Sequence, residues 1–323
     1  MIGALRRAGV LGINARNALY TLRCNPRSHY PLVDDKLATK RLCQEAGIPV
    51  PKLLAVARVH LEARRLPGLL RDERAFVLKP ARGAMGNGIV VLQRAADGSL
   101  RRSGRPYPEA AFVYHAAGII SGLYSLAGHM DVAMVEECLE VHAGLAALVS
   151  EGVPDVRVIV YRGVPVMAMT RLPTRASGGR ANLHQGALGV GIDLSTGLTV
   201  HAMLRNRPIR SNPETGRSLL GHTIPFFDRA LEIAVAATDQ VGLDYVGADV
   251  VVDARHGPVI LELNARPGLA IQIANRAGLR PRLDAVDRVL GRSDSDFEHM
   301  LPVAERVKLG RDVARAAHAA AAA

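Results

Sequence analysis

Two apolar segments in the last third of the chain constrain its fold more than any other feature. Residues 247–253 and 257–268 are rich in valine, isoleucine and leucine, and a polar turn containing a Gly-Pro pair joins them. This pattern predicts a β-hairpin. Glu262 and Asn264 are two residues apart and so face the same side of a strand, and Asp249 can lie beside them on the partner strand.

The oxygen-bearing side chains of this hairpin suit a metal ion. Magnesium prefers hard oxygen ligands, takes one or two carboxylates and completes its coordination with waters and substrate phosphates. We therefore predict that Asp249, Glu262 and Asn264 bind Mg²⁺. The alternative is a polar strand face with a solvated glutamate and asparagine, although both are poor strand formers and interrupt an apolar run.

The composition indicates a protein with an aliphatic core. Its 323 residues suffice for one large or two medium domains, and 49% of them are hydrophobic although tryptophan is absent. No apolar stretch reaches the ~18–20 residues of a membrane span, and we expect no secretory signal. The 3 cysteines lack metal-ligand spacing and fit a reducing compartment, so a cytoplasmic location is expected.

The net charge of +11 comes almost entirely from arginine, since lysine occurs only at positions 36, 40, 52, 79 and 308. Each lysine is therefore informative, because its site can disfavour the planar guanidinium group. The positive charge favours an anionic partner. A nucleic-acid partner is not expected, because basic and aromatic residues are not interleaved and no nucleic-acid motif is present.

The remaining pattern of apolar residues, glycines and prolines predicts alternating helices and strands without an internal repeat. Residues 171–186 are expected to form a polar, glycine-rich loop, and the alanine-rich residues 314–323 a frayed helix. Helices are expected at residues 35–46, 109–127, 225–241, 270–277 and 282–290, and strands at 75–79, 88–92, 132–136, 155–161, 164–170 and 188–193.

A lysine at a strand end followed by glycines indicates phosphate binding. Lys79 ends the strand at 75–79, and Gly83, Gly86 and Gly88 follow it. Glycines let backbone N–H groups approach phosphate oxygens closely, and a lysine supplies a point charge. The segment is neither a Walker A motif nor a dinucleotide fingerprint, because no helix opens directly after the glycines. A glycine-rich hairpin without a ligand is the alternative.

Further candidates are weaker when each is taken alone. Lys36 is either a second phosphate-binding cation or an exposed residue in a first helical turn. Arg157 can fork onto a phosphoryl or carboxylate group, or pair with Asp155 on a solvated face. The polar loop adds Arg171, Arg180, Asn182 and His184, and a histidine taken alone is more often structural.

Taken in order, these motifs resemble the ATP-grasp superfamily and, within it, the α-L-glutamate ligase-like proteins related to the ribosomal-protein glutamate ligase. The resemblance covers residues 34–278. It is carried by Asp35-Lys36-Leu37, Gly47-Ile48-Pro49-Val50-Pro51, Leu78-Lys79-Pro80 with its glycine loop, Val135-Glu136-Glu137-Cys138-Leu139, Asp155-Val156-Arg157, Arg180-Ala181-Asn182-Leu183-His184-Gln185-Gly186, and the hairpin with Asn264-Ala265-Arg266-Pro267-Gly268.

The resemblance implies an α/β (α+β) ATP-grasp fold in which two lobes clamp ATP. The implied parts are a basic helical arm at 1–34, an N-terminal lobe with the glycine lid at 35–135, a C-terminal lobe with the metal site at 136–290, and an alanine-rich tail at 291–323. The family's usual N-terminal Rossmann-like domain is expected to be lacking, because only 34 residues precede the first lysine motif.

The resemblance also implies a role for each motif. ATP would be bound by Lys36, Lys79, the lid glycines Gly83, Gly86 and Gly88, the hinge Glu136, Glu137, Cys138 and Leu139, and His184. The catalytic residues would be Arg157 and Asn182 at the transferred phosphoryl group, with Arg171 and Arg180 on substrate carboxylates. The metal on Asp249, Glu262 and Asn264 would be Mg²⁺, with Mn²⁺ as an alternative.

The implied reaction is ATP-dependent amide formation. A carboxylate is a poor electrophile until phosphorylation supplies a good leaving group, which an amine then displaces. Glutamate or a similar amino acid would be joined to an amino-acid, peptide or protein acceptor. The arginines of residues 200–224 either recognise an anionic acceptor or form a solvated basic loop. A kinase that stops at phosphoryl transfer, a non-catalytic nucleotide-binding scaffold and a homo-oligomeric state are left open.

Overall fold

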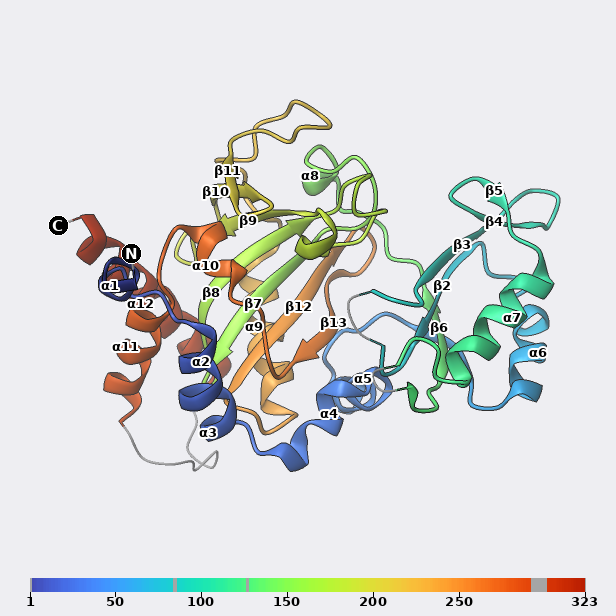
Figure 1. Ribbon diagram of the computed structural model, residues 1–323, viewed down its shortest axis with the longest axis horizontal. Helices are drawn as coiled ribbons and strands as arrows, with labels where there is room; N and C mark the ends of the chain where they lie inside the picture. The colour runs from blue at the N-terminus through green and yellow to red at the C-terminus, as the bar shows by residue number, and fades with distance from the viewer. Residues whose placement is uncertain (1, 84–85, 126–127, 292–300, 323) are drawn as a thin grey trace. The chain divides into compact units, whose positions relative to one another are not determined.

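The computed structural model describes residues 2–83, 86–125, 128–291 and 301–322 (Figure 1). The chain divides into two compact units: a large unit of Met1–Asp34, Arg41–Val50 and Glu140–Ala323, and a small unit of Asp35–Lys40 and Pro51–Leu139. Each unit contains an antiparallel sheet together with helices. The prediction of a mixed α+β chain is therefore confirmed.

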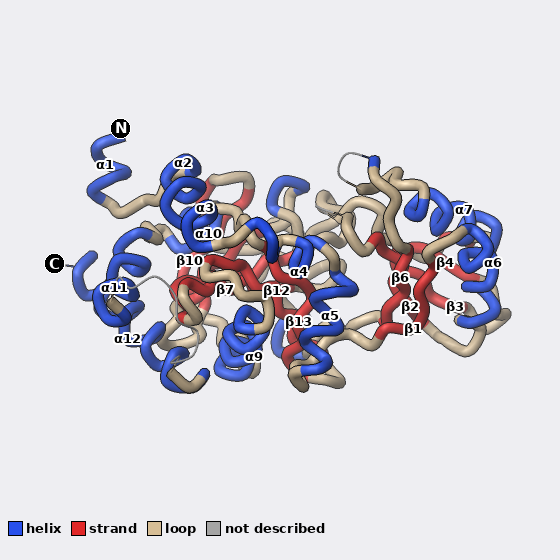
Figure 2. The backbone as a smooth tube through the Cα atoms, turned by 90° about the horizontal axis from the view of Figure 1, so that it is seen from below, coloured by secondary structure: helices blue, strands red, loops and turns tan. Residues whose placement is uncertain are grey.

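The small unit is a six-stranded sheet covered by two helices. Helices α6 (His60–Leu69) and α7 (Glu109–Ile120) pack against each other and on the sheet (Figure 2). Phe76, Leu78 and Phe112 are buried between these layers and fix the central strands. In sheet order the strands are β1 Leu53–Ala57, β6 Ala133–Glu137, β2 Ala75–Pro80, β3 Val90–Arg94, β4 Leu100–Arg102 and β5 Arg105–Pro106.

The large unit is built on a seven-stranded antiparallel sheet. Its central strands are apolar runs, as expected for a sheet that is covered on both faces. In sheet order the strands are β11 Arg207–Ile209, β10 Thr199–Leu204, β9 Leu188–Ile192, β8 Val164–Leu172, β7 Asp155–Tyr161, β12 Tyr245–Asp253 and β13 Gly257–Asn264.

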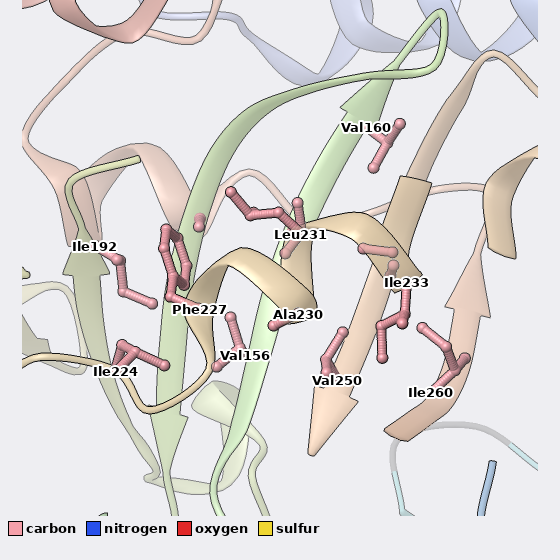
Figure 3. Close-up of a cluster of buried hydrophobic side chains, with 14 of the residues drawn as sticks. Val156, Val160, Ile192, Ile224, Phe227, Ala230, Leu231, Ile233, Val250 and Ile260 are labelled. Carbon is pink, nitrogen blue, oxygen red and sulfur yellow. The ribbon is translucent and has the colours of Figure 1, made fainter. Parts of the chain in front are cut away.

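Helix α9 (Phe227–Asp239) covers one face of the large sheet. Figure 3 shows Phe227 and Leu231 of this helix packed among side chains of the strands, including Val156 and Val250. The even-numbered residues of β7 and β12 point into this cluster, because side chains alternate along a strand. The odd-numbered residues of β7 and β12 consequently face the opposite side of the sheet.

The opposite face carries the N-terminal segment and two further helices. Tyr20 packs on Tyr161 and Tyr245, with ring centroids 5.4 and 5.7 Å from its own. This face is therefore apolar where the N-terminal segment covers it. The covering elements are α2 Ile13–Ala15, the π-helix η1 Arg16–Thr21, α3 Leu22–Cys24, α10 Ala270–Asn275 and α11 Arg280–Leu290, and α1 Ile2–Arg7 precedes them.

The last helix packs against the large unit before the alanine-rich end begins. Helix α12 (Val303–Ala322) contacts β8 and α9, and its Val307, Val313 and Ala314 are buried. Gly310 lets the helix lie close to Pro165 of β8. Of the described alanine-rich residues, only Ala314 is among the buried ones, so the expected fraying of residues 314–323 stays a prediction. Among the described helices, none is both long and apolar enough to cross a bilayer.

Most predicted elements are present with shifted ends. Helix α5 (Lys36–Glu45) is capped by Asp35, whose carboxylate accepts the Leu37 N–H at 2.9 Å. Helix α7 ends at Ile120, earlier than predicted, because Gly122 has φ +84° and a side chain there would meet the His129 carbonyl. The remaining short helices are η2 Arg27–His29, α4 Pro31–Asp34, α8 Ala143–Ala146 and η4 Leu183–Gln185.

Both edges of the large sheet are modified. At one edge, β11 has Pro208 as its middle residue, which lacks a backbone N–H. At the other edge, the Ile260 N–H of β13 donates to the Pro49 carbonyl at 2.9 Å. β10 and β11 also show that residues 200–224, expected to be a loop insertion, begin as a hairpin whose turn residues Arg205 and Asn206 have positive φ.

Candidate functional site

The β12–β13 hairpin brings the predicted metal ligands together. Asp249 lies directly opposite Glu262, and Gly247 lies opposite Asn264. A bulge between Asp249 and Val250 shifts the register by one residue and creates this pairing. Bulges re-aim side chains and are common beside active sites. All of these residues belong to the large unit.

Two arginines of neighbouring strands converge on Asp249. Arg157 donates from Nε to Asp249 Oδ1 at 2.7 Å and from Nη2 to Asp249 Oδ2 at 2.6 Å. Arg171 donates to Asp249 Oδ2 at 2.7 Å and also forks onto Asp155, with Nε at 2.7 Å from Oδ1. Asp155 thus pairs with Arg171 rather than with Arg157, and the cluster is buried rather than solvated.

The arginines decide which carboxylate carries the charge. Burial alone would raise the pKa of Asp249, but Arg157 and Arg171 outweigh it and lower that pKa to about 2. Burial, together with the nearby Asp249 charge, raises the pKa of Asp155 to about 6 despite its bonds to Arg171. The Arg171 pKa is raised, because Asp155 and Asp249 overcome its desolvation. Asp249 is therefore an ionised carboxylate at neutral pH.

The donor set of the hairpin fits magnesium chemically. It offers two carboxylates and an amide oxygen, and each carboxylate oxygen can accept more than one bond. Asn264 Oδ1 accepts the Arg266 N–H at 2.8 Å, which fixes the amide orientation. Within the described residues, no cluster of three or more histidines, cysteines and acids could hold a metal by itself. The metal role of Asp249, Glu262 and Asn264 stays a prediction that needs other ligands.

The remaining predicted catalytic residues and His184 lie at the end of β8 and in the loop after it. Arg171 lies on β8 and joins the cluster, whereas Arg180 donates to Gln185 at 3.3 Å. Asn182 caps the η4 turn by accepting the His184 N–H at 2.9 Å, and the His184 side chain is exposed. Their predicted roles toward phosphate and substrate remain predictions.

In the small unit, two buried lysines flank one buried glutamate. Lys79 Nζ lies 2.5 Å from Glu136 Oε2, and Lys40 Nζ lies 2.8 Å from Glu136 Oε1. Burial raises the Glu136 pKa, but Lys79 and Lys40 outweigh it and lower the pKa below its usual value. Lys40 was not among the predicted residues. A signal was present, because Lys40 follows Lys36 by one helical turn and shares its face.

The predicted glycine loop has positions that only glycine fits. A side chain on Gly83 would come within 2.2 Å of the Pro80 ring. Gly86 and Gly88 both have φ +76°, a left-handed conformation that glycine adopts at low cost. Lys36 Nζ donates to the Gly83 carbonyl at 2.7 Å, at the start of the loop. Residues 84–85 lie outside the described residues.

The predicted hinge lies where the chain leaves the small unit. That unit ends at Leu139, three residues after Glu136. Glu137 accepts the Lys52 N–H at 2.8 Å, and Cys138 and Leu139 are partly exposed. Their predicted contact with adenine stays a prediction.

Comparison with known proteins gives a family for the chain. The model of the sugar-transfer associated ATP-grasp family matches residues 15–288. A probable alpha-L-glutamate ligase of Parasynechococcus marenigrum (strain WH8102) is 26% identical over 293 residues, which are 88% of this chain and 46% of the relative. A probable alpha-L-glutamate ligase of Haemophilus influenzae (strain ATCC 51907 / DSM 11121 / KW20 / Rd) is 23% identical over 256 residues, which are 79% of this chain and 62% of the relative.

The chain thus spans roughly half to three fifths of the length of these curated relatives. Among solved structures, the ATP-grasp ligase PsnB complexed with minimal precursor is 16% identical with a TM-score of 0.45, covering 84% of this chain and 64% of its own. The D-cycloserine synthetase DcsG is 14% identical with a TM-score of 0.43, covering 90% and 73%. Similarity this low supports no inference, whereas the family model matches most of the chain. The chain therefore belongs to the sugar-transfer associated ATP-grasp family, which confirms the ATP-grasp resemblance.

Proposed function

We propose that the protein is an ATP-dependent carboxylate–amine ligase. The observation that carries the proposal is the buried cluster of the large unit, where the ionised Asp249 pairs with Arg157 and Arg171 and lies opposite Glu262. Phosphoryl transfer needs cations and a metal near the transferred group more than it needs covalent help. The family match and the two probable alpha-L-glutamate ligases support the same activity.

In the proposed reaction, a substrate carboxylate oxygen attacks the γ-phosphorus of ATP and ADP leaves. The amine of the second substrate then attacks the acyl-phosphate carbon, phosphate departs, and the nitrogen loses a proton to give an amide. Bound Mg²⁺, held by Asp249, Glu262 and Asn264, would neutralise phosphate charge. Mn²⁺ is the alternative ion. In the small unit, we assign phosphate binding to Lys36, Lys79 and the glycine loop, and adenine contact to residues 136–139.

The remaining assignments concern substrates. By analogy with the relatives, glutamate or a similar amino acid supplies the amine. Arg180 is assigned to a substrate carboxylate, Asn182 to the transferred phosphoryl group and His184 to ATP. The acceptor is proposed to be anionic, because the β10–β11 hairpin and the loop after it expose a group of arginines. Residues 199–227 contain a single acid, Glu214. We call this group the basic hairpin; it consists of Arg205, Arg207, Arg210 and Arg217.

The proposal also covers location and assembly. Cys24, Cys43 and Cys138 are thiols rather than disulfides, which agrees with a reducing cytoplasm. A homo-oligomer stays a prediction, to be tested by the mass of the protein in solution.

The test of the activity is product analysis. The purified chain is incubated with ATP, Mg²⁺ and each amino acid, alone and with acidic peptides, and ADP and products are measured by mass. The proposal expects one ADP per amide formed. A stable phosphorylated product without an amide would assign a kinase, and absence of ADP with every substrate would leave no support for a ligase.

Two variants with matched controls test the residues. Glu262→Gln is expected to reduce ADP formation by at least about 100-fold, because a metal carboxylate is lost, whereas Glu232→Gln at a partly exposed position of α9 leaves it unchanged. Lys79→Met is expected to weaken ATP binding about tenfold or more, whereas the exposed Lys52→Met has no effect. Unchanged turnover in Glu262→Gln contradicts the metal assignment, and unchanged ATP affinity in Lys79→Met contradicts the phosphate role.

A further inference from the structure

Arg16 is a buried cation that the proposed chemistry leaves unused. It begins the π-helix η1 and is 8% exposed. Its terminal nitrogen donates to the Pro267 carbonyl at 2.9 Å, and its Nε is buried without an acceptor among the described residues. The bonded partner is thus a neutral carbonyl, and no carboxylate of the described residues pairs with this guanidinium.

Arg16 lies beside the metal hairpin. Pro267 follows the predicted ligand Asn264 by three residues. A Cβ placed on Gly247 would lie 2.7 Å from Pro267 Cβ and 3.8 Å from Arg157 Nε. Arg16 thus contacts Pro267, and Pro267 lies close to Gly247, next to Arg157 of the buried charge cluster.

The segment that carries Arg16 is held in place by two buried amides. The Asn25 side chain donates to the Tyr245 and Ala265 carbonyls at 2.8 and 3.0 Å and accepts the Tyr245 N–H at 3.0 Å. The Gln272 side chain accepts the Leu11 N–H at 2.8 Å and donates to the Leu11 carbonyl at 3.0 Å. These clamps fix the backbone on both sides of Arg16, so its position is set by the fold.

A buried guanidinium without a counter-ion is costly, since desolvation is not repaid by an ion pair. Asp249, the ionised carboxylate of the buried cluster, already accepts bonds from Arg157 and Arg171. The planar fork of an arginine matches a carboxylate. We propose that Arg16 binds a carboxylate of the amino-acid substrate, one that does not itself react. A carboxylate held by a guanidinium is a weaker nucleophile, which keeps that group from being phosphorylated.

This inference rests on the proposed ligase function and names one of its substrate contacts. The test measures binding of three probes to the full chain by calorimetry, in the presence of a non-hydrolysable ATP analogue and Mg²⁺. The probes are L-glutamate, its γ-amide glutamine and its α-amide isoglutamine. The wild type is expected to bind L-glutamate about 10- to 100-fold more tightly than one of the amides, because a charged hydrogen bond is lost.

Arg16→Met is expected to lose that preference, and Arg16→Lys to retain part of it because the charge remains. Arg282→Met is the matched control. Arg282 is also buried, also donates to a carbonyl, Val166 at 2.9 Å, and also has a buried Nε without an acceptor. It contacts His318 of α12 rather than Pro267, so its loss is expected to leave the preference intact.

A second readout separates binding from support of the fold. If Arg16 serves a ligand, Arg16→Met is expected to unfold at the same or a higher urea concentration than the wild type, since a buried unpaired charge is removed. Retained preference for L-glutamate in Arg16→Met, or absence of any preference in the wild type, overturns the inference. Neither result touches the proposed ligase function, which is judged separately by ADP and amide formation with the wild type.

Discussion

The lysine pair around Glu136 gives the sharpest prediction about stability. The change is Glu136→Gln, which keeps the shape of the side chain and removes its charge. Glu136 is 3% exposed, and both of its oxygens contact ammonium groups, those of Lys40 and Lys79. The substitution therefore leaves two buried cations facing a neutral amide.

The magnitude follows from the charge balance of the group. Removing one partner of a buried ion pair costs about 3–5 kcal/mol, because the other charge is left uncompensated. Glu136→Gln leaves two such charges, so we expect the upper end, about 5 kcal/mol. Lys40→Met instead leaves one cation with one anion and removes a group that also donates to the Pro51 carbonyl, so we expect about 1–2 kcal/mol.

The assay is urea unfolding followed by far-UV circular dichroism, with hydrogen exchange of the β2 and β6 amides as the local readout. Saturating ATP and Mg²⁺ is expected to stabilise Glu136→Gln more than the wild type if its lysines hold phosphates, because a ligand stabilises the state it binds. A loss below about 1 kcal/mol in Glu136→Gln, or a larger loss in Lys40→Met, refutes the reasoning about charge balance.

Three further predictions concern the large unit. Asn25→Ala is expected to destabilise the protein by about 2–4 kcal/mol in urea unfolding, because three buried backbone bonds lose their partner; a loss below about 0.5 kcal/mol contradicts the clamp. Burial, with nearby Asp244, raises the pKa of Cys24 to about 11 from 9.0, so the thiolate fraction at pH 8 falls about 100-fold. The rate of Cys24 labelling by iodoacetamide, measured by peptide mass, is expected to be slow and to rise about tenfold per pH unit toward pH 11. A rate that reaches its plateau near pH 9 would show an ordinary thiol. Replacing all arginines of the basic hairpin by glutamine is expected to weaken binding of poly-L-glutamate at least tenfold while leaving ATP binding unchanged, and equal affinity at low salt would remove the hairpin as the acceptor surface.

The elements of the candidate site could be predicted from sequence, whereas several of its contacts could not. Alternation and turn residues were enough to predict the β12–β13 hairpin and to suggest Asp249 beside Glu262. The direct pairing depends on the bulge between Asp249 and Val250. Without that extra residue, Asp249 would face Leu261, because a one-residue slip exchanges the two faces of a strand.

The same physics explains the position of Arg171. The two-residue turn at Arg162-Gly163 would pair Asp155 with Thr170 in an uninterrupted hairpin. A bulge between Ile159 and Val160 moves the partner to Arg171, which brings its guanidinium to the charge cluster. Bulges have no reliable signature in a single sequence, so this contact could not be foreseen.

Long-range contacts to buried charges were also beyond the sequence. Lys40 was recognisable as a scarce lysine, but its contact with Glu136 depends on where the first turns of α5 lie against the small sheet. Arg16 stood in a basic segment rich in arginine, and only the fold distinguishes it from its exposed neighbours. The composition gives the number of arginines, whereas burial in the fold determines which of them are costly to leave without a counter-ion.

The modified edges of the large sheet limit how a polypeptide partner can bind to it. With Pro208 in the middle of β11 and the Ile260 N–H already used by Pro49, neither margin offers an uninterrupted row of main-chain donors. An incoming chain cannot readily extend the sheet by strand addition, and misfolded copies gain no template there. A peptide that binds beside β11 must instead be recognised by contacts to its side chains. Such contacts select a peptide by its charge more than by the shape of its backbone.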